Sequence, residues 1–208
     1  MVSVYFGSIG CGKTTVACKL LRKSRKRYDH FFTTFKTLDL KNCHHWQNFE
    51  GLGLVTPPEH SLLVDDESGI TYNNRKYKSM PQHTIEWYKL SRHYKCDVIL
   101  MSQAFDDMDI TLRRLASEYW YLRRVGPWTL SRQVYKYCTV DENTHQIIDG
   151  YRMASVFSAV TSFLAFILRP IPFLNSVFRQ QWRLTFRPFY YKYFDSFWHP
   201  DLPLVDFE

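Results

Sequence analysis

The chain has 208 residues, of which 45% are hydrophobic and 23% are charged. This composition excludes a disordered or fibrous protein and is sufficient for an α/β domain with a buried core. The formal net charge of +7 favours an anionic partner such as nucleic acid, nucleotide or lipid headgroups, without distinguishing among them. Five scattered cysteines without C-x-x-C spacing argue against a disulfide framework or a zinc site and suit a reducing compartment.

The first predicted element is a short buried strand over residues 2–6, which runs into the stretch GSIGCGKTT. Four residues fit the phosphate-loop pattern G-x-x-x-x-G-K-[ST]: Gly7, Gly12, Lys13 and Thr14. Glycines let backbone N–H groups close on phosphate oxygens, and the helix that follows points its positive end at the same charge. Lys13 would reach the β- and γ-phosphates of ATP, and the Thr14 hydroxyl would hold Mg²⁺. The predicted nucleotide-binding residues are Gly7, Gly10, Gly12, Lys13, Thr14 and Thr15.

Strands and helices then alternate along the chain. The expected strands cover residues 31–40, 60–67, 96–103 and 133–140, and the expected helices follow the loop and cover residues 84–94 and 109–124. This alternation predicts a mostly parallel sheet with helices on both faces. We therefore expect an α/β P-loop NTPase fold of the additional-strand ATPase type, with an apolar helical insertion near the C-terminus.

Acidic side chains follow the third predicted strand in the stretch LLVDDE. A carboxylate at this place in a phosphate-loop fold associates with Mg²⁺, and Asp66 is the predicted metal residue, with Asp65 the alternative if the register shifts by one. Glu67 comes next and can polarise a water for in-line attack on the γ-phosphate. The alternative is that the three acids only end the strand.

Gln103 ends the predicted strand VILMSQ and is the expected sensor of the γ-phosphate; the alternative is an ordinary amide at a strand end. The predicted helix 109–124 carries Arg113 and Arg114 on opposite sides of its apolar stripe, so the two cannot point the same way. One of them could reach a neighbouring subunit as an arginine finger, although exposed arginines are also common on surface helices.

The sequence resembles the Zot family, named for zonular occludens toxin, which includes the assembly ATPases of filamentous bacteriophages. The resemblance rests on GSIGCGKT, LLVDDESG, WYKLSRHYKCDVILMSQ, DMDITLRRLASEYWYLRR and the later YKYFDSF. It implies Lys13 and Thr14 for phosphate and Mg²⁺ and Asp66 for the metal. It also implies Glu67 for water, Gln103 as sensor, and Arg113 or Arg114 as finger.

The resemblance implies an ATP-hydrolysing motor that drives phage assembly and extrusion at the cytoplasmic face of the host inner membrane. Its expected partners are further copies of this chain with shared active sites, phage coat or assembly proteins, and the membrane. A DNA translocase or packaging ATPase is the alternative, because the basic runs at 22–27 and 75–78 could contact nucleic acid. A nucleotide or nucleoside kinase is the weaker alternative, since such enzymes must exclude the water that Glu67 would activate.

The predicted organisation is an ATPase domain over 1–152, an apolar and basic insertion over 153–186, and an aromatic segment over 187–208 that closes the ATPase domain. The insertion contains fifteen consecutive residues without a charge (154–168), fewer than the ~20 that a straight membrane-spanning helix needs. We therefore expect residues 154–178 to form a hairpin that dips into one leaflet. The alternative is a buried helical pair packed against the sheet or a neighbouring subunit.

Overall fold

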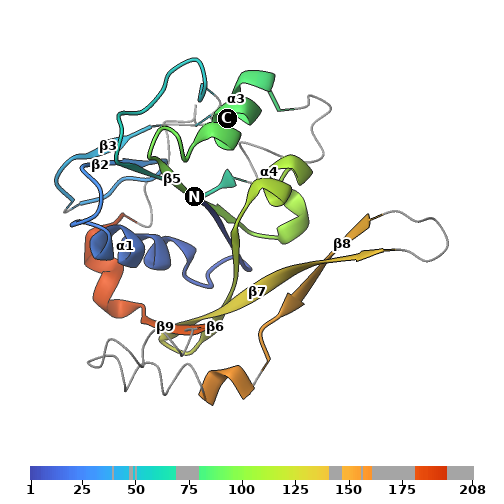
Figure 1. Cartoon of the computed structure of the whole chain (residues 1–208). Helices are drawn as coiled ribbons and strands as arrows, with labels where there is room; N and C mark the ends of the chain where they lie inside the picture. The colour runs from blue at the N-terminus through green and yellow to red at the C-terminus, as the bar shows by residue number, and fades with distance from the viewer. Residues whose placement is uncertain are drawn as a thin grey trace, which may run out of the picture.

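The computed structural model describes residues 1–38, 40–46, 49, 51–68, 80–140, 147–155, 157–160 and 181–195. These residues form one twisted sheet of nine strands with helices on both faces (Figure 1). The α/β class predicted from the sequence is confirmed. The apolar insertion lies for the most part outside the described residues, so its predicted helical hairpin stays a prediction.

Six neighbouring strands form the parallel part of the sheet. In spatial order they are β3 (Cys43–His45), β2 (His30–Thr33), β4 (Ser61–Asp65), β5 (Asp97–Ser102), β1 (Val2–Phe6) and β6 (Glu118–Val125). β5 lies between β1, which leads into the glycine loop, and β4, which ends in the acids. This is the additional-strand arrangement that the sequence predicted. The carboxyl ends of β1, β4 and β5 therefore meet at one edge of the sheet.

Beyond β6 the sheet is antiparallel. β7 (Trp128–Val140) is long, and its outer edge is shared by two strands: β9 (Trp182–Phe186) pairs with residues 128–132, and β8 (Ile147–Met153) pairs with residues 134–140. Figure 1 shows β7 and β8 projecting together away from the rest of the sheet. The predicted boundaries need one correction, because residues 182–186 were assigned to the insertion but form a strand of the main sheet.

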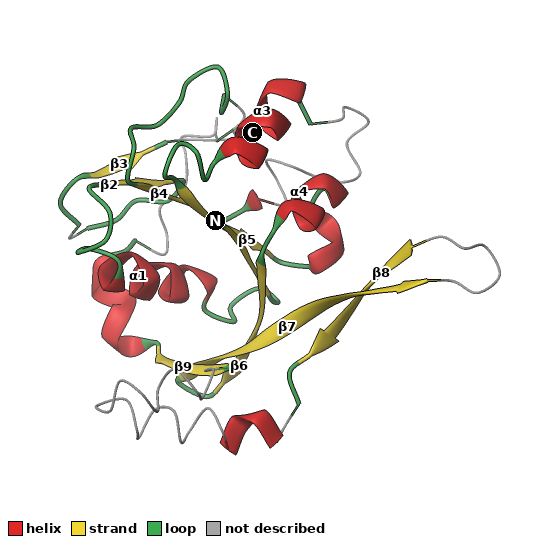
Figure 2. Ribbon diagram, in the orientation of Figure 1, coloured by secondary structure: helices red, strands yellow, loops and turns green. Residues whose placement is uncertain are grey.

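The helices cover the two faces of the parallel part. α1 (Lys13–Lys23) packs on one face, beside the 3₁₀ helix η2 (Pro188–Tyr193), while α3 (Gln82–Leu90) and α4 (Ile110–Leu115) lie on the other (Figure 2). A shorter 3₁₀ turn, η1 (Phe105–Asp107), joins β5 to α4. Among the described residues no helix is both long and apolar enough to cross a bilayer.

Each face of the sheet has its own hydrophobic core, because successive side chains of a strand point to opposite faces. Along β4, Leu63 packs in the core under α3 and α4, whereas Leu62 and Val64 pack in the core under α1. Neighbouring residues of β1 divide in the same way, with Val4 on the first face and Tyr5 on the second. The sheet is thus buried on both sides at the place where the glycine loop leaves it.

The predicted helix over 109–124 was half wrong. Asp109 caps α4 by accepting a hydrogen bond from the Thr111 N–H at 2.7 Å, but the helix ends at Leu115 because Ala116 is extended. Residues 118–125 instead form β6, which pairs in parallel with β1. Tyr119 is buried in the core on one face of the sheet, and Trp120 and Leu122 are buried in the core on the other. β6 thereby pairs with the edge of β1, which a helix over 109–124 would leave unpaired.

Candidate nucleotide-binding site

The glycine loop fits tightly against the hairpin of β6 and β7. A Cβ atom at Gly7 would lie 2.4 Å from the Leu122 carbonyl oxygen, and one at Gly12 would lie 2.3 Å from the Thr129 hydroxyl oxygen. Gly12 also has a φ of +97°, which side chains disfavour. The Thr129 hydroxyl donates a 2.7 Å hydrogen bond to the Cys11 carbonyl. These contacts hold the loop in shape and explain why glycine occupies both positions.

Lys13 folds back over the loop. Its buried ammonium donates hydrogen bonds to the Gly7 carbonyl at 3.0 Å and, more weakly, to the Ser8 carbonyl at 3.4 Å. The residue also opens α1, whose first turn contains no acidic side chain that would compete for the positive helix end. A fixed cation and the positive end of a helix therefore face the same concave stretch of backbone, an arrangement suited to an anion such as a phosphate chain.

Thr14 and Asp66 meet across the gap between α1 and β4. The Thr14 hydroxyl donates a 2.5 Å hydrogen bond to Asp66 Oδ2, while Asp66 Oδ1 is buried and has no hydrogen-bond partner among the described residues. A hydroxyl and a carboxylate with a spare oxygen are hard oxygen ligands of the kind that Mg²⁺ prefers. The donor set fits the predicted metal site, with Thr14 and Asp66 as the residues that would hold the ion.

Asp65 has a different role from Asp66. Its Oδ1 accepts hydrogen bonds from the Glu67 N–H at 3.2 Å and the Thr34 hydroxyl at 3.4 Å. Thr34 in turn accepts a 2.9 Å hydrogen bond from the Asp66 N–H. The Asp65 side chain thus stabilises the turn after β4, while the next side chain, Asp66, contacts Thr14. The sequence analysis missed Thr34, which lies in a threonine pair inside the predicted strand 31–40, because the observed strand β2 already ends at Thr33.

Both aspartates lie in a poorly solvated environment. Burial raises the pKa of Asp66 from its ordinary 3.8 to about 7, against the opposing hydrogen bond from Thr14, and the nearby Glu67 raises it further. Burial also raises the pKa of Asp65 to about 7, with Asp66 adding to the effect against its hydrogen bonds. Two carboxylates pressed together away from water favour the arrival of a counter-cation at this edge of the sheet.

The raised pKa of Asp66 makes the free protein less stable as pH rises. A carboxyl that holds its proton more tightly when folded contributes stability at low pH and loses it as the pH passes through the folded pKa. In EDTA and without nucleotide, we expect the melting temperature to fall by several degrees between about pH 5 and pH 8. Asp66→Asn should flatten this fall, whereas Asp29→Asn, at an exposed aspartate, should not. An unchanged pH profile in Asp66→Asn would contradict the prediction.

Glu67 and Gln103 come together from the ends of neighbouring strands. Gln103 Nε2 lies 3.4 Å from Glu67 Oε2, and the Gln103 side chain is exposed. Just beyond, the Ser68 hydroxyl donates a 2.8 Å hydrogen bond to the Met101 carbonyl and ties the two strand ends together. The predicted water-activating carboxylate and the predicted γ-phosphate sensor therefore stand side by side, at the same edge as Thr14 and Asp66.

Arg113 and Arg114 occupy different environments. The Arg113 side chain is only 13% exposed, donates a 3.0 Å hydrogen bond to Asp106 and lies over the Phe105 ring. The Arg114 side chain is 64% exposed, with its Nε 3.7 Å from an Asp149 oxygen. Within one chain the two arginines contact different aspartates, and Arg114 is the more accessible to a neighbouring molecule.

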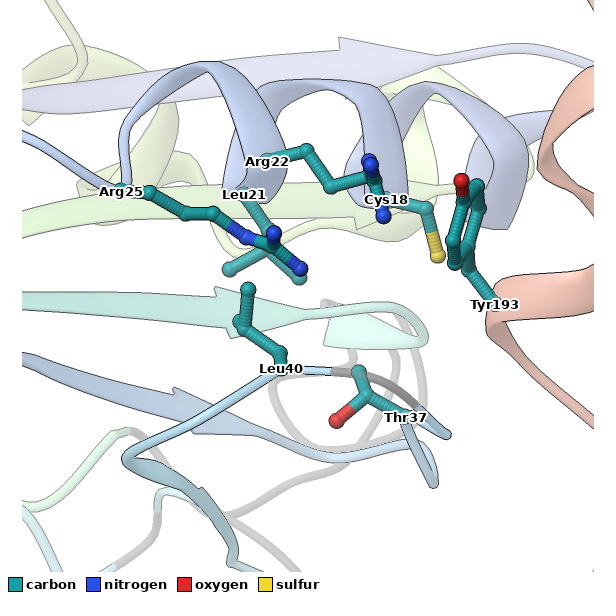
Figure 3. A pocket seen from close by; sticks show the side chains of 7 residues that line it. All are labelled: Cys18, Leu21, Arg22, Arg25, Thr37, Leu40 and Tyr193. Atoms are coloured by element: carbon teal, nitrogen blue, oxygen red, sulfur yellow. The ribbon is translucent and has the colours of Figure 1, made fainter.

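Two residues of the basic run at 22–27, Arg22 and Arg25, line a small hollow beside the C-terminal half of α1, away from the glycine loop. Figure 3 shows Arg22 and Arg25 beside Cys18, Leu40 and Tyr193, and the Arg22 guanidinium lies 3.8 Å from the centre of the Tyr193 ring. Arg22 therefore packs against the C-terminal segment. The hollow is separate from the nucleotide site, because the two lie at opposite ends of the same helix. The basic loop 75–78 lies outside the described residues.

The comparisons with known proteins agree with this geometry. The sheet order and the glycine loop define a phosphate-loop α/β fold, the class of the P-loop NTPases. The model of the zonular occludens toxin (Zot) family matches residues 1–156. The chain belongs to the Zot family. A comparison with curated proteins gives no match.

Among solved structures, the chain is similar to the N-terminal domain of zonular occludens toxin from Neisseria meningitidis. The TM-score is 0.54 at 16% identity, over 74% of this chain and 94% of that one. It is also similar to the genome-packaging NTPase B204 of Sulfolobus turreted icosahedral virus 2 in complex with AMP. That match has a TM-score of 0.51 at 11% identity, over 71% of this chain and 95% of that one. At these identities the likeness concerns the fold.

Proposed function

We propose that this protein is an Mg²⁺-dependent ATPase of the Zot type that drives filamentous phage assembly and extrusion. The observation that carries the proposal is the convergence of five side chains at one edge of the sheet in a chain of this family: Lys13, Thr14, Asp66, Glu67 and Gln103. Lys13 binds the phosphates, and Thr14 and Asp66 hold the metal, which supplies charge neutralisation on the phosphate oxygens.

Hydrolysis needs a water in line with the γ-phosphate and a group to take its proton. Glu67 follows directly after the metal aspartate, and its carboxylate is positioned by the Gln103 amide at 3.4 Å. Glu67 orients the attacking water and accepts its proton as the water oxygen bonds to the γ-phosphorus. The bond from the γ-phosphorus to the β–γ bridging oxygen breaks in the same displacement, and ADP leaves. Gln103, on the adjacent strand, senses whether the γ-phosphate is present.

The proposed motor is a homo-oligomer, and Arg114 is the preferred finger because its side chain is 64% exposed, whereas that of Arg113 is 13% exposed. An exposed guanidinium can enter a neighbour's site and neutralise charge in the transition state. The oligomer acts at the cytoplasmic face of the host inner membrane, together with phage coat or assembly proteins. The predicted attachment through 154–178 belongs to this proposal.

The shared site can be tested by mixing two inactive variants. Lys13→Ala subunits still offer Arg114, and Arg114→Ala subunits still bind ATP, so a mixture should hydrolyse ATP faster than the sum of the two alone. Phosphate release is the measurement, and Arg113→Ala in place of Arg114→Ala is the matched comparison. Full wild-type activity in a preparation shown to be monomeric by light scattering would refute the shared site.

A DNA translocase or packaging ATPase is the second candidate, favoured by the likeness of the fold to B204, which is described as a genome-packaging NTPase. The two functions differ in what stimulates hydrolysis. For the assembly motor we expect phosphate release to rise with liposomes containing anionic lipids and to be indifferent to single- or double-stranded DNA. Flotation of the whole chain against one lacking 154–178 measures attachment in parallel. Stimulation by DNA alone would favour the packaging function.

A further inference from the structure

Arg187 lies beside the glycine loop although it comes from the far end of the described chain. It follows β9 directly, and its backbone N–H donates a 3.0 Å hydrogen bond to the Pro127 carbonyl in the turn between β6 and β7. Lys19 of α1 fixes the same segment, because its ammonium donates hydrogen bonds to the Leu184 carbonyl at 2.6 Å and to Thr185 Oγ1 at 3.0 Å. The backbone that carries Arg187 is therefore anchored to both neighbours of the loop.

The Arg187 side chain packs against Gly12. A Cβ atom placed on Gly12 would lie 3.3 Å from Arg187 Nε and 3.4 Å from its Cδ, so the arginine occupies the space that the missing side chain leaves. The guanidinium also lies 5.8 Å from the centre of the Tyr191 ring. Gly12 thus serves two purposes: it allows the left-handed turn into α1, and it admits a guanidinium next to the helix N-terminus.

The described part of the chain supplies no counter-charge at this place. Arg187 Nε is buried without a hydrogen-bond partner, and no carboxylate among the described residues forms an ion pair with Arg187. A buried N–H without an acceptor is unfavourable. Together with Lys13 and the positive end of α1, Arg187 adds a third positive group around one stretch of loop. An anionic oxygen at the loop would satisfy all three.

The side from which Arg187 arrives indicates which phosphate it meets. Asp66, Glu67 and Gln103 reach the loop from β4 and β5, on one side of β1, and mark the γ-phosphate end of the site. Arg187 arrives from the other side of β1, over β7 and β9. A phosphate chain lying along the loop would present its α-phosphate to this side.

We propose that Arg187 is a nucleotide-binding residue of its own subunit that contacts the α-phosphate of the bound nucleotide. The inference rests on the proposed function, because it presumes that the loop binds ATP. Arg187 differs from the predicted finger, since it serves its own subunit's site and contacts nucleotide before and after hydrolysis. It also gives the C-terminal aromatic segment a direct part in nucleotide binding.

Titration calorimetry with ATP and with ADP tests this assignment. The variants are Arg187→Gln, Arg187→Lys and, as a matched control, Lys192→Gln. The control removes a positive charge from η2, where the exposed lysine lies over the rings of Phe189 and Tyr193. Losing a charge-assisted hydrogen bond should weaken the binding of both nucleotides by about tenfold or more in Arg187→Gln. Arg187→Lys should fall in between, because it keeps the charge without the planar fork, and Lys192→Gln should bind like the wild type.

Three results would overturn the proposal. One is unchanged affinity for both nucleotides in Arg187→Gln. Another is a loss confined to ATP, which would place the guanidinium at the γ-phosphate. The third is an equal loss in Arg187→Gln and Arg187→Lys with a lowered melting temperature of the nucleotide-free protein, which would mean that Arg187 only supports the loop. A wild-type chain that binds neither nucleotide would refute the proposed function itself, so the two failures are distinguishable.

Discussion

Lys13→Ala is expected to abolish measurable ATP binding. The ammonium is buried over the loop by the Gly7 and Ser8 carbonyls, so its position is fixed before the nucleotide arrives. Removing a buried cation from a phosphate site costs its charge-assisted hydrogen bonds and should weaken the affinity by about 100-fold or more. Calorimetric titration with Mg²⁺–ATP measures this directly.

The matched control for Lys13→Ala is Lys23→Ala, at an exposed lysine in the last turn of the same helix. It removes the same charge from α1 but far from the loop, and we expect it to leave the affinity unchanged. Circular dichroism melting should show that both variants fold. Equal affinity of Lys13→Ala and the wild type would exclude the loop as the nucleotide site.

Glu67→Gln should keep ATP binding and lose hydrolysis. The substitution preserves the shape of the side chain and leaves an amide oxygen that can still accept from Gln103, but an amide cannot take a proton from water. General-base catalysis contributes about 10²- to 10⁴-fold, and phosphate release should fall by a factor in this range. The binding measured for Lys13→Ala and the turnover measured for Glu67→Gln thus distinguish the two roles of the site, nucleotide binding and hydrolysis.

Glu86→Gln is the control for Glu67→Gln. Glu86 is an exposed glutamate of α3 that accepts a 2.9 Å hydrogen bond from Gln82, and its replacement should leave turnover unchanged. If Glu67→Gln hydrolysed ATP at the normal rate, the water-activating role would be wrong, and a nucleotide or nucleoside kinase would again become a serious hypothesis.

The part of the site that the sequence predicts well is the part that depends on short spacing. The glycine pattern, the strand before it and the helix after it are contiguous, and the structure places them as expected. The position of β5 between β1 and β4 also followed from the order of motifs. Asp66, rather than Asp65, faces Thr14 because Asp65 is held by Thr34 and the Glu67 N–H, a choice that the spacing left open.

The helix predicted over 109–124 shows why local patterns fail. Leu112, Leu115, Ala116 and Tyr119 follow a helical period, yet the chain turns into a strand after Ala116. A strand buried on both faces shows no alternation, so β6 carried no period-two signal that could compete. Its conformation is decided by the exposed edge of β1, which is distant in the sequence.

Contacts of the glycine loop with the later strands were not predicted by the sequence analysis. Thr129 and Arg187 touch the glycine loop from β7 and from the start of η2, and no spacing in the sequence links either of them to Gly12. β9 was also missed, although its residues WRLTF alternate apolar and polar side chains, because they lie in a basic aromatic stretch that was assigned to the insertion. Only the folded topology brings these segments to the loop.

The shared outer edge of β7 has a consequence for how the protein can be made. Half of that edge is covered by β8, which follows soon in the chain, but the half over residues 128–132 stays open until β9 has left the ribosome. During that interval the nascent chain exposes an unpaired strand edge next to the glycine loop, which Thr129 of β7 contacts. A fragment ending at residue 156, where the family match ends, would display it permanently and should aggregate by edge-to-edge pairing. Soluble expression of this protein therefore calls for chains that include β9, which ends at Phe186.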